Sequence, residues 1–170
     1  MLAFIERFQP AGFPAGTIYP CYGLAEATLF VAGGVRGEGM RTDEFSPQLL
    51  AQGKAEVVSR GLPVVACGFP ASNHSIKIVD PETLTPLPDG CVGEIWTDGP
   101  SLARGYWQRP HETEHAFLWH EDGCWLRTGD LGFMHAKQLH IMGRLKDLII
   151  IRGQNIYPQD IELIIEEKVE

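Results

Sequence analysis

The sequence lacks the features that mark several classes of protein. It has no apolar run approaching the roughly 20 residues that span a bilayer. Its N-terminus carries Glu6 and Arg7, where a signal peptide would be apolar. Its four cysteines stand far apart and form no CxxC pair, which argues against a zinc knuckle or a redox pair. We therefore expect a cytoplasmic protein with reduced thiols and no transmembrane segment.

Basic charge is also scarce. The 170 residues include 14 Lys and Arg against 22 Asp and Glu, a formal net charge of −8. Non-specific nucleic-acid binding needs basic patches that displace counterions, and no basic stretch with interleaved aromatics occurs. We expect no nucleic-acid partner. The apolar fraction, 44%, is ordinary for a globular protein, and the length suffices for one hydrophobic core.

Turn residues divide most of the chain into short elements. Apolar residues at helical spacing predict a helix over residues 1–8, and Pro110 begins a second one over 110–117. Short β-type runs predict strands at 64–67, 75–79, 93–97, 125–127, 131–134 and 138–142. We expect the last three to form a small antiparallel sheet, with the four tryptophans in a barrel core rather than on a carbohydrate-binding or peptide-binding surface.

The pattern changes after Arg144. Residues 148–151 form an apolar run that is typical of a strand covered on both faces. Tyr157 and Pro158 then begin a helix with one apolar face. Helices stand at both ends of the sequence without their outer turns, so we expect the chain to be part of a larger protein.

One candidate site lies near the N-terminus. Tyr22, Gly23 and Glu26 bring an aromatic ring, a flexible backbone position and a carboxylate within five residues. The ring could stack on a purine, the glycine could let backbone approach a phosphate, and the carboxylate could hold Mg²⁺. A loop that enters a helix with a solvated glutamate is the alternative interpretation.

A second candidate site consists of Asp130 and Arg144, which flank a predicted hairpin. A carboxylate has enough acceptor sites to bind both hydroxyls of a ribose, and a guanidinium adds planar donors for sugar or phosphate oxygens. The alternative interpretation is a surface aspartate in a turn and an arginine in an ordinary ion pair.

Together these residues resemble the adenylate-forming enzymes, the superfamily of acyl-CoA synthetases, amino-acid adenylation domains and luciferases. The resemblance rests on motifs in that superfamily's order, namely 22–26, 93–96, 105–107, 128–130 and 143–147. Within the superfamily the chain is similar to the fatty-acyl-AMP ligases, in the segments 19–30, 78–83, 92–96 and 157–162. The implied fold is mixed α/β: the end of a large N-terminal domain with its small β-barrel subdomain, and the start of a C-terminal domain.

The resemblance implies a role for each site residue. Tyr22 would stack on adenine, with Ile141 covering the other face of the base. Asp130 would hold the ribose hydroxyls, helped by Arg144. Glu26 would bind Mg²⁺ beside the triphosphate, so that ATP and Mg²⁺ are the expected cofactors.

The resemblance also implies a domain organisation. Residues 1–145 would end the AMP-binding domain, with an insertion near 43–66 that restrains the C-terminal domain in these ligases. Residues 146–170 would begin the C-terminal domain, with Lys146 as the hinge and Gly153 on a loop that faces the site.

The implied reaction has two steps. A fatty-acid carboxylate attacks the α-phosphorus of ATP and releases pyrophosphate, and the acyl group then passes to the thiol of an acyl carrier protein. No Ser/Thr/Gly-rich phosphate loop ending in Lys occurs in the sequence. The resemblance places the catalytic lysine beyond residue 170, so we expect no catalytic residue within the chain and little or no activity from it alone.

The sequence departs from the wider superfamily at three positions. Ala25 stands where many members have threonine, as is usual in the fatty-acyl-AMP ligases, so no hydroxyl reaches the phosphates from there. Gln154 and Ile156 replace two basic or titratable groups, which puts carrier-protein contacts at these positions in doubt.

Three other functions are compatible with parts of the sequence. One is an acyl-CoA synthetase, and another is a non-catalytic remnant that binds a nucleotide or a partner. The third is a metalloprotease, because His111 and His115 match the HExxH pattern of zinc enzymes. We favour an ordinary surface helix there, since it is short and has no third ligand at a familiar spacing.

Overall fold

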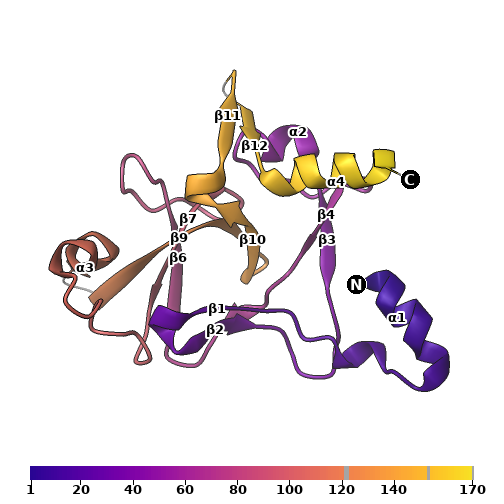
Figure 1. The fold of residues 1–170 in the computed structure, drawn as a ribbon, viewed down its shortest axis with the longest axis horizontal. Helices are drawn as coiled ribbons and strands as arrows, with labels where there is room; N and C mark the ends of the chain where they lie inside the picture. Colours follow the sequence, from indigo (N-terminus) through magenta and orange to yellow (C-terminus); the bar gives the residue numbers. More distant parts are fainter. Residues whose placement is uncertain (121–122, 153, 170) are drawn as a thin grey trace.

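The computed structural model of the protein describes residues 1–120, 123–152 and 154–169, and it has a mixed α/β fold made mostly of strands (Figure 1). Its helices are α1 (Leu2–Phe8), α2 (Pro47–Leu50), α3 (Pro110–Ala116) and α4 (Pro158–Val169). The 3₁₀ turns are η1 (Gln9–Ala11), η2 (Ala15–Thr17), η3 (Ala25–Ala27) and η4 (Leu145–Asp147). The three predicted helices correspond to α1, α3 and α4.

The largest sheet is antiparallel, with the strand order β10-β9-β7-β6. Its strands are β6 (Ser75–Val79), β7 (Gly93–Asp98), β9 (Gly123–His135) and β10 (Gln138–Arg144), while β8 (Phe117–His120) pairs with the first residues of β9. The predictions for β6, β7 and β10 are confirmed. The two strands predicted at 125–127 and 131–134 are one continuous strand, β9, in which Gly129 has a φ of 71°.

Two smaller sheets complete the body of the molecule. One contains β1 (Cys21–Leu24), β2 (Leu29–Gly33) and β5 (Phe69–Pro70), and the other pairs β3 (Thr42–Phe45) with β4 (Leu62–Val65). Leu139 of β10 exchanges backbone hydrogen bonds with Cys67 and Gly68, just before β5. The large sheet therefore curls toward the β1-β2-β5 sheet.

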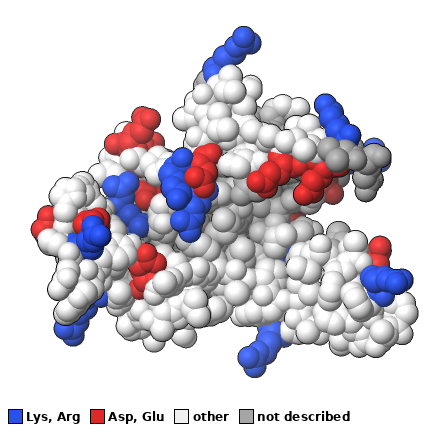
Figure 2. All heavy atoms as spheres, viewed as in Figure 1, with Lys and Arg blue, Asp and Glu red and all other residues white. Residues whose placement is uncertain are grey.

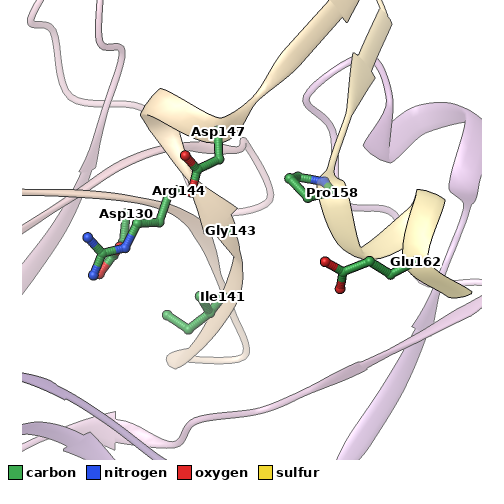
Figure 3. A pocket seen from close by; sticks show the side chains of 7 residues that line it. All are labelled: Asp130, Ile141, Gly143, Arg144, Asp147, Pro158 and Glu162. Atoms are coloured by element: carbon green, nitrogen blue, oxygen red, sulfur yellow. The ribbon is translucent and has the colours of Figure 1, made fainter.

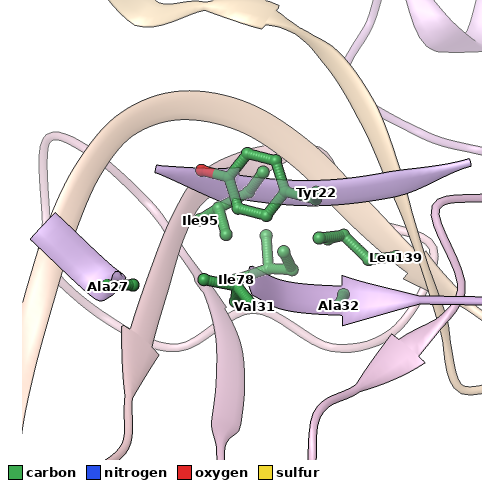
Figure 4. Packing of buried hydrophobic residues seen from close by; sticks show 7 residues of the cluster. All are labelled: Tyr22, Ala27, Val31, Ala32, Ile78, Ile95 and Leu139. Carbon is green, nitrogen blue, oxygen red and sulfur yellow. The ribbon is translucent and has the colours of Figure 1, made fainter. Parts of the chain in front are cut away.

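The main core lies between these layers. Figure 4 shows side chains from β1, β2, β6, β7 and β10 meeting there. The buried members are Tyr22, Ala27, Val31, Ala32, Ile78, Ile95 and Leu139. Burial of each large apolar side chain stabilises the fold by about 1.5–3 kcal/mol. This core fixes the strands that carry the candidate site.

The expected insertion, residues 43–66, forms part of a second core. Phe45, Leu50 and Val64 from this segment are buried against Phe133 of β9. The rings of Phe45 and Phe133 meet edge to face at 4.9 Å. The segment is therefore integrated into the fold and is not a free loop.

The hairpin of β11 (Ile149–Ile151) and β12 (Gln154–Ile156) projects from the body (Figure 1). The strand expected to be covered on both faces leaves Ile149, Ile150 and Ile151 42%, 64% and 52% exposed, so this expectation was wrong for the described residues. The backbone N–H of Asn155 donates to the carbonyl oxygen of Ala51 at 2.8 Å, which ties β12 to the end of α2.

The tryptophans divide into two pairs. Trp96 and Trp125 are buried, as expected, and the ammonium group of Lys77 lies 3.6 Å from the centre of the Trp125 ring. Trp107 and Trp119 are 88% and 76% exposed, so the expectation of a core position was wrong for these two. Trp107 precedes α3 in the sequence, and Trp119 lies in β8, the strand that directly follows α3 and pairs with β9.

None of the helices in the described part of the chain combines the length and the apolar character that a membrane crossing requires.

Candidate functional site

The β9–β10 hairpin brings Asp130 and Arg144 together. The two residues are direct partners in the strand pairing. The Nε atom of Arg144 lies 3.2 Å from Oδ1 of Asp130. The hairpin turns at Ala136 and Lys137, whose φ angles of 48° and 64° suit a tight turn with the twist of the flanking strands. Residues that are 14 positions apart in the sequence thus form an ion pair at the far end of the hairpin.

Tyr22 binds the other oxygen of the same carboxylate. Its hydroxyl donates to Oδ2 of Asp130 at 2.7 Å. Burial raises the pKa of the Tyr22 phenol far above its usual range, so the group stays a donor at any physiological pH. The ring is only 8% exposed and packs in the main core. The stacking of Tyr22 on adenine stays a prediction, and the structure adds a core position and a bond to Asp130 that the sequence did not indicate.

A hollow of about 400 Å³ lies between the end of β10, η4 and the start of α4 (Figure 3). Its lining residues are Asp130, Ile141, Gly143, Arg144, Asp147, Pro158 and Glu162. The hollow thus joins three of the predicted site residues, Asp130, Ile141 and Arg144. Sequence reasoning assigned no role to Asp147 or Glu162, because their position depends on how η4 and α4 fold back.

The charges in this hollow favour a ligand that donates hydrogen bonds. Asp130, Asp147 and Glu162 supply three carboxylates against the single guanidinium of Arg144. Figure 2 shows further acidic side chains gathered over α4. A phosphate group would be repelled here, whereas sugar hydroxyls could donate to the carboxylates.

Glu26 lies elsewhere, on η3, and does not line this hollow. Its Oε1 accepts a hydrogen bond from the hydroxyl of Tyr106 at 2.7 Å, and its carbonyl oxygen accepts from the N–H of Ala103. Burial and the adjacent carboxylate raise the pKa of Tyr106 to about 12. No motif in the sequence pointed to Tyr106 as a partner, because 80 residues separate it from Glu26.

A magnesium ion is compatible with Glu26. Mg²⁺ binds through one or two carboxylates, keeps several waters and completes its shell with substrate phosphates. The Oε2 atom of Glu26 has no protein hydrogen bond in the described chain, so it can serve as such a ligand. Among the described residues, no group of three or more His, Cys, Asp or Glu side chains could hold a metal ion without a ligand's help.

Gly23 has a structural role that the sequence did not reveal. A Cβ atom at this position would overlap the carbonyl oxygen of Leu29 in the neighbouring strand β2. The β1–β2 pairing is irregular between Tyr22 and Gly23, which brings the two backbones unusually close. This close approach of the two strands is by itself sufficient to require a glycine at position 23, whether or not its backbone also contacts a phosphate.

Lys146 lies exposed in η4, between β10 and the β11–β12 hairpin, and its role as a hinge stays a prediction. The domain boundary between residues 145 and 146 stays a prediction, and Gly153 lies outside the described residues. The HExxH histidines, His111 and His115, are exposed on α3 with ring centres 4.6 Å apart.

Comparison with known proteins adds independent information. Residues 2–107 match the family described as AMP-binding enzyme. The chain is 43% identical to the long-chain-fatty-acid–AMP ligase FadD26 of Mycobacterium tuberculosis, over 96% of its own length and 30% of the ligase. It is 45% identical to the medium-chain-fatty-acid–[acyl-carrier-protein] ligase JamA of Moorena producens, over 96% of its own length and 29% of that protein. The chain thus spans about 30% of the length of these relatives.

Solved structures agree with these relatives. A fatty acyl-adenylate ligase structure, from work on the Escherichia coli and Legionella pneumophila enzymes, superposes with a TM-score of 0.87 at 38% identity, over 97% of this chain and 30% of the other. A fatty acyl-adenylate ligase from L. pneumophila in complex with acyl adenylate and pyrophosphate superposes with a TM-score of 0.78 at 44% identity, over 94% of this chain and 29% of the other.

Proposed function

Because the chain belongs to the AMP-binding enzyme family, we propose that it supplies the ribose-binding site of a ligase that activates a fatty acid with ATP. This site, called the ribose grip below, is the Asp130 carboxylate held by Tyr22 and Arg144. The observation that carries this proposal is the Asp130 carboxylate at the hollow beside Arg144 and Ile141. The similarity to FadD26 and JamA, over nearly the whole chain, supports the fatty acid as the substrate.

In this proposal the carboxylate of Asp130 accepts hydrogen bonds from the ribose hydroxyls. The Tyr22 hydroxyl and the Arg144 guanidinium hold the carboxylate from two sides, so it is oriented before the nucleotide arrives. Ile141 offers an apolar surface to the adenine. The acidic lining turns the phosphates away from the hollow, toward the rest of the protein.

Glu26 is the residue that would hold Mg²⁺. When bound, the ion would neutralise charge on the phosphates as the fatty-acid carboxylate attacks the α-phosphorus and pyrophosphate leaves. The chain's own contribution is to position the carboxylate. The Tyr106 hydroxyl donates to the carboxylate itself, and the Ala103 amide donates to the backbone carbonyl oxygen of Glu26 in η3. We also propose that the ligase containing this chain is located in the cytoplasm.

The ribose grip can be tested by binding of AMP to the chain in isothermal titration calorimetry. A carboxylate that accepts hydroxyl hydrogen bonds contributes about 1.5–3 kcal/mol per bond, so Asp130→Asn should weaken AMP binding about tenfold or more. Asp89→Asn removes the same charge from an exposed turn and should leave the affinity unchanged. Equal affinities for Asp130→Asn and wild type would rule the ribose grip out.

For the second step, we propose that the acyl group passes to an acyl carrier protein rather than to CoA. The contact of Asn155 with Ala51 supports this choice, because it ties β12 to the segment 43–66, which would restrain the C-terminal domain. Deleting that segment would remove Phe45 from a core, so a milder change is preferable.

Asn155→Pro removes the N–H donor and fixes φ at this position, whereas Asn155→Ala loses the same side chain but keeps the donor. In a full-length ligase that carries this chain, we expect Asn155→Pro to raise acyl transfer to CoA relative to Asn155→Ala. Equal transfer by the two variants, at a high rate in both, would favour the rival function of an acyl-CoA synthetase.

A further inference from the structure

Strand β9 contains a three-residue bulge that includes Asp130, the residue proposed to bind the ribose. Trp96 of β7 pairs with Arg127, and Glu94 pairs with Leu131. Between these pairs β9 advances by four residues (127 to 131) while β7 advances by two (94 to 96). Three residues of β9, 128–130, therefore stand opposite Ile95 alone. On the side that faces β7, their backbone groups lose regular ladder partners and must be satisfied in another way.

Two side chains supply the missing partners. Oε1 of Glu94 accepts a hydrogen bond from the backbone N–H of Gly129 at 3.2 Å. The hydroxyl of Thr128 donates to the carbonyl oxygen of Ile95 at 2.7 Å and accepts from the N–H of Asp130 at 3.1 Å. The carboxylate of Glu94 thus replaces a strand as the partner of the residue next to Asp130.

Glu94 is itself held rigidly. It is only 2% exposed. Its Oε2 accepts hydrogen bonds from Nε and Nη2 of Arg127, at 3.0 and 2.9 Å, and from the indole N–H of Trp96 at 3.0 Å. A buried ion pair adds little net stability compared with apolar residues of the same volume, so stability alone does not explain a charge at this position.

We propose that Glu94 is a positioning residue for ribose recognition. By fixing the Gly129 amide it sets the shape of the bulge, and the bulge aims the Asp130 carboxylate at the hollow. Displacements of about 1 Å in such a constellation are enough to lose most of a site's binding or catalytic advantage. The inference rests on the ribose grip proposed above, since Glu94 would act only through Asp130.

The test compares AMP with 2′,3′-dideoxyadenosine monophosphate, which lacks both ribose hydroxyls. Binding of each nucleotide to the wild-type chain and its variants is measured by calorimetry, and the ratio of the two dissociation constants reports contacts with the hydroxyls alone. Glu94→Gln removes the charge while keeping the shape. Arg127→Lys leaves the Glu94 carboxylate in place but replaces the guanidinium, which donates two hydrogen bonds to it, with the single ammonium group of lysine. Glu82→Gln, in an exposed turn, is the matched control.

We expect the wild type and Glu82→Gln to bind AMP at least about tenfold more tightly than the dideoxy analogue. In Glu94→Gln the preference should fall to about twofold or less, with binding of the analogue unchanged, and Arg127→Lys should be intermediate. A purely structural role would weaken both nucleotides equally.

Full preference for AMP in folded Glu94→Gln and Arg127→Lys would overturn the inference while leaving the ribose grip intact. If Glu94→Gln does not fold, the preference of Arg127→Lys decides. If the wild type itself shows no preference, the ribose grip fails and the inference falls with it.

Discussion

The hydrogen bond from Tyr22 to Asp130 links the main core to the candidate site, and its removal tests both. Tyr22→Phe keeps the ring among its buried neighbours and deletes only the hydroxyl. A hydrogen bond to a charged group contributes about 1.5–3 kcal/mol. Arg144 still contacts the carboxylate at 3.2 Å, and the Asp130 side chain is 12% exposed, so water can compensate only in part. We therefore expect the free energy of unfolding to fall by about 1.5–2 kcal/mol.

Urea unfolding followed by tryptophan fluorescence measures this change, because Trp96 and Trp125 are buried. The slope of the transition should stay the same, since the variant exposes no additional surface on unfolding. Tyr19→Phe is the control. The side chain of Tyr19 is 42% exposed, so we expect a change of less than about 0.5 kcal/mol.

A double-mutant cycle with Asp130→Asn then isolates the pair. We expect the two single changes to be coupled by about 1 kcal/mol or more, because the residues are in direct contact. Strict additivity, or a change for Tyr22→Phe no larger than that for Tyr19→Phe, would refute the argument that this bond joins the site to the core.

Three further changes test other parts of the structure by urea unfolding. Gly23→Ala forces a Cβ into a backbone carbonyl and should cost about 3 kcal/mol or prevent folding. Burial lowers the pKa of His140, so the neutral ring is favoured in the folded protein. The contribution of His140 to the free energy of unfolding is therefore fully present above about pH 6.5 and is lost as the pH falls below that value. In His140→Phe the free energy of unfolding should fall less over the same pH range. The pair Ala136→Asn and Lys137→Gly relieves two positive φ angles in the hairpin turn and should raise the free energy of unfolding by about 1–2 kcal/mol.

The sequence allowed the hairpin between Asp130 and Arg144 to be predicted because a hairpin depends on local order. A turn between two β-type runs places Asp130 and Arg144 on adjacent strands, and the register then makes them neighbours. The bond between Tyr22 and Asp130 spans 108 positions, and no local pattern encodes it. The predicted stacking of Tyr22 on adenine therefore came without its core position or its bond to Asp130, both of which only the structure reveals.

Burial was the least predictable property. An apolar run such as Ile149 to Ile151 has the same pattern whether other elements cover it or not, so the prediction of a covered strand had no local support. Glu94 gave a signal that could have been used. It is a charged residue inside an otherwise buried strand, β7, and such a residue requires a partner and often a function.

The bond between Asn155 and Ala51 has a consequence for how relatives of this chain are compared. Both of its atoms belong to the main chain, so almost any pair of side chains at these two positions preserves it. Substitution patterns would therefore carry no trace of this attachment, apart from an avoidance of proline at position 155. Amide hydrogen exchange at that single residue would reveal the attachment where sequence comparison cannot.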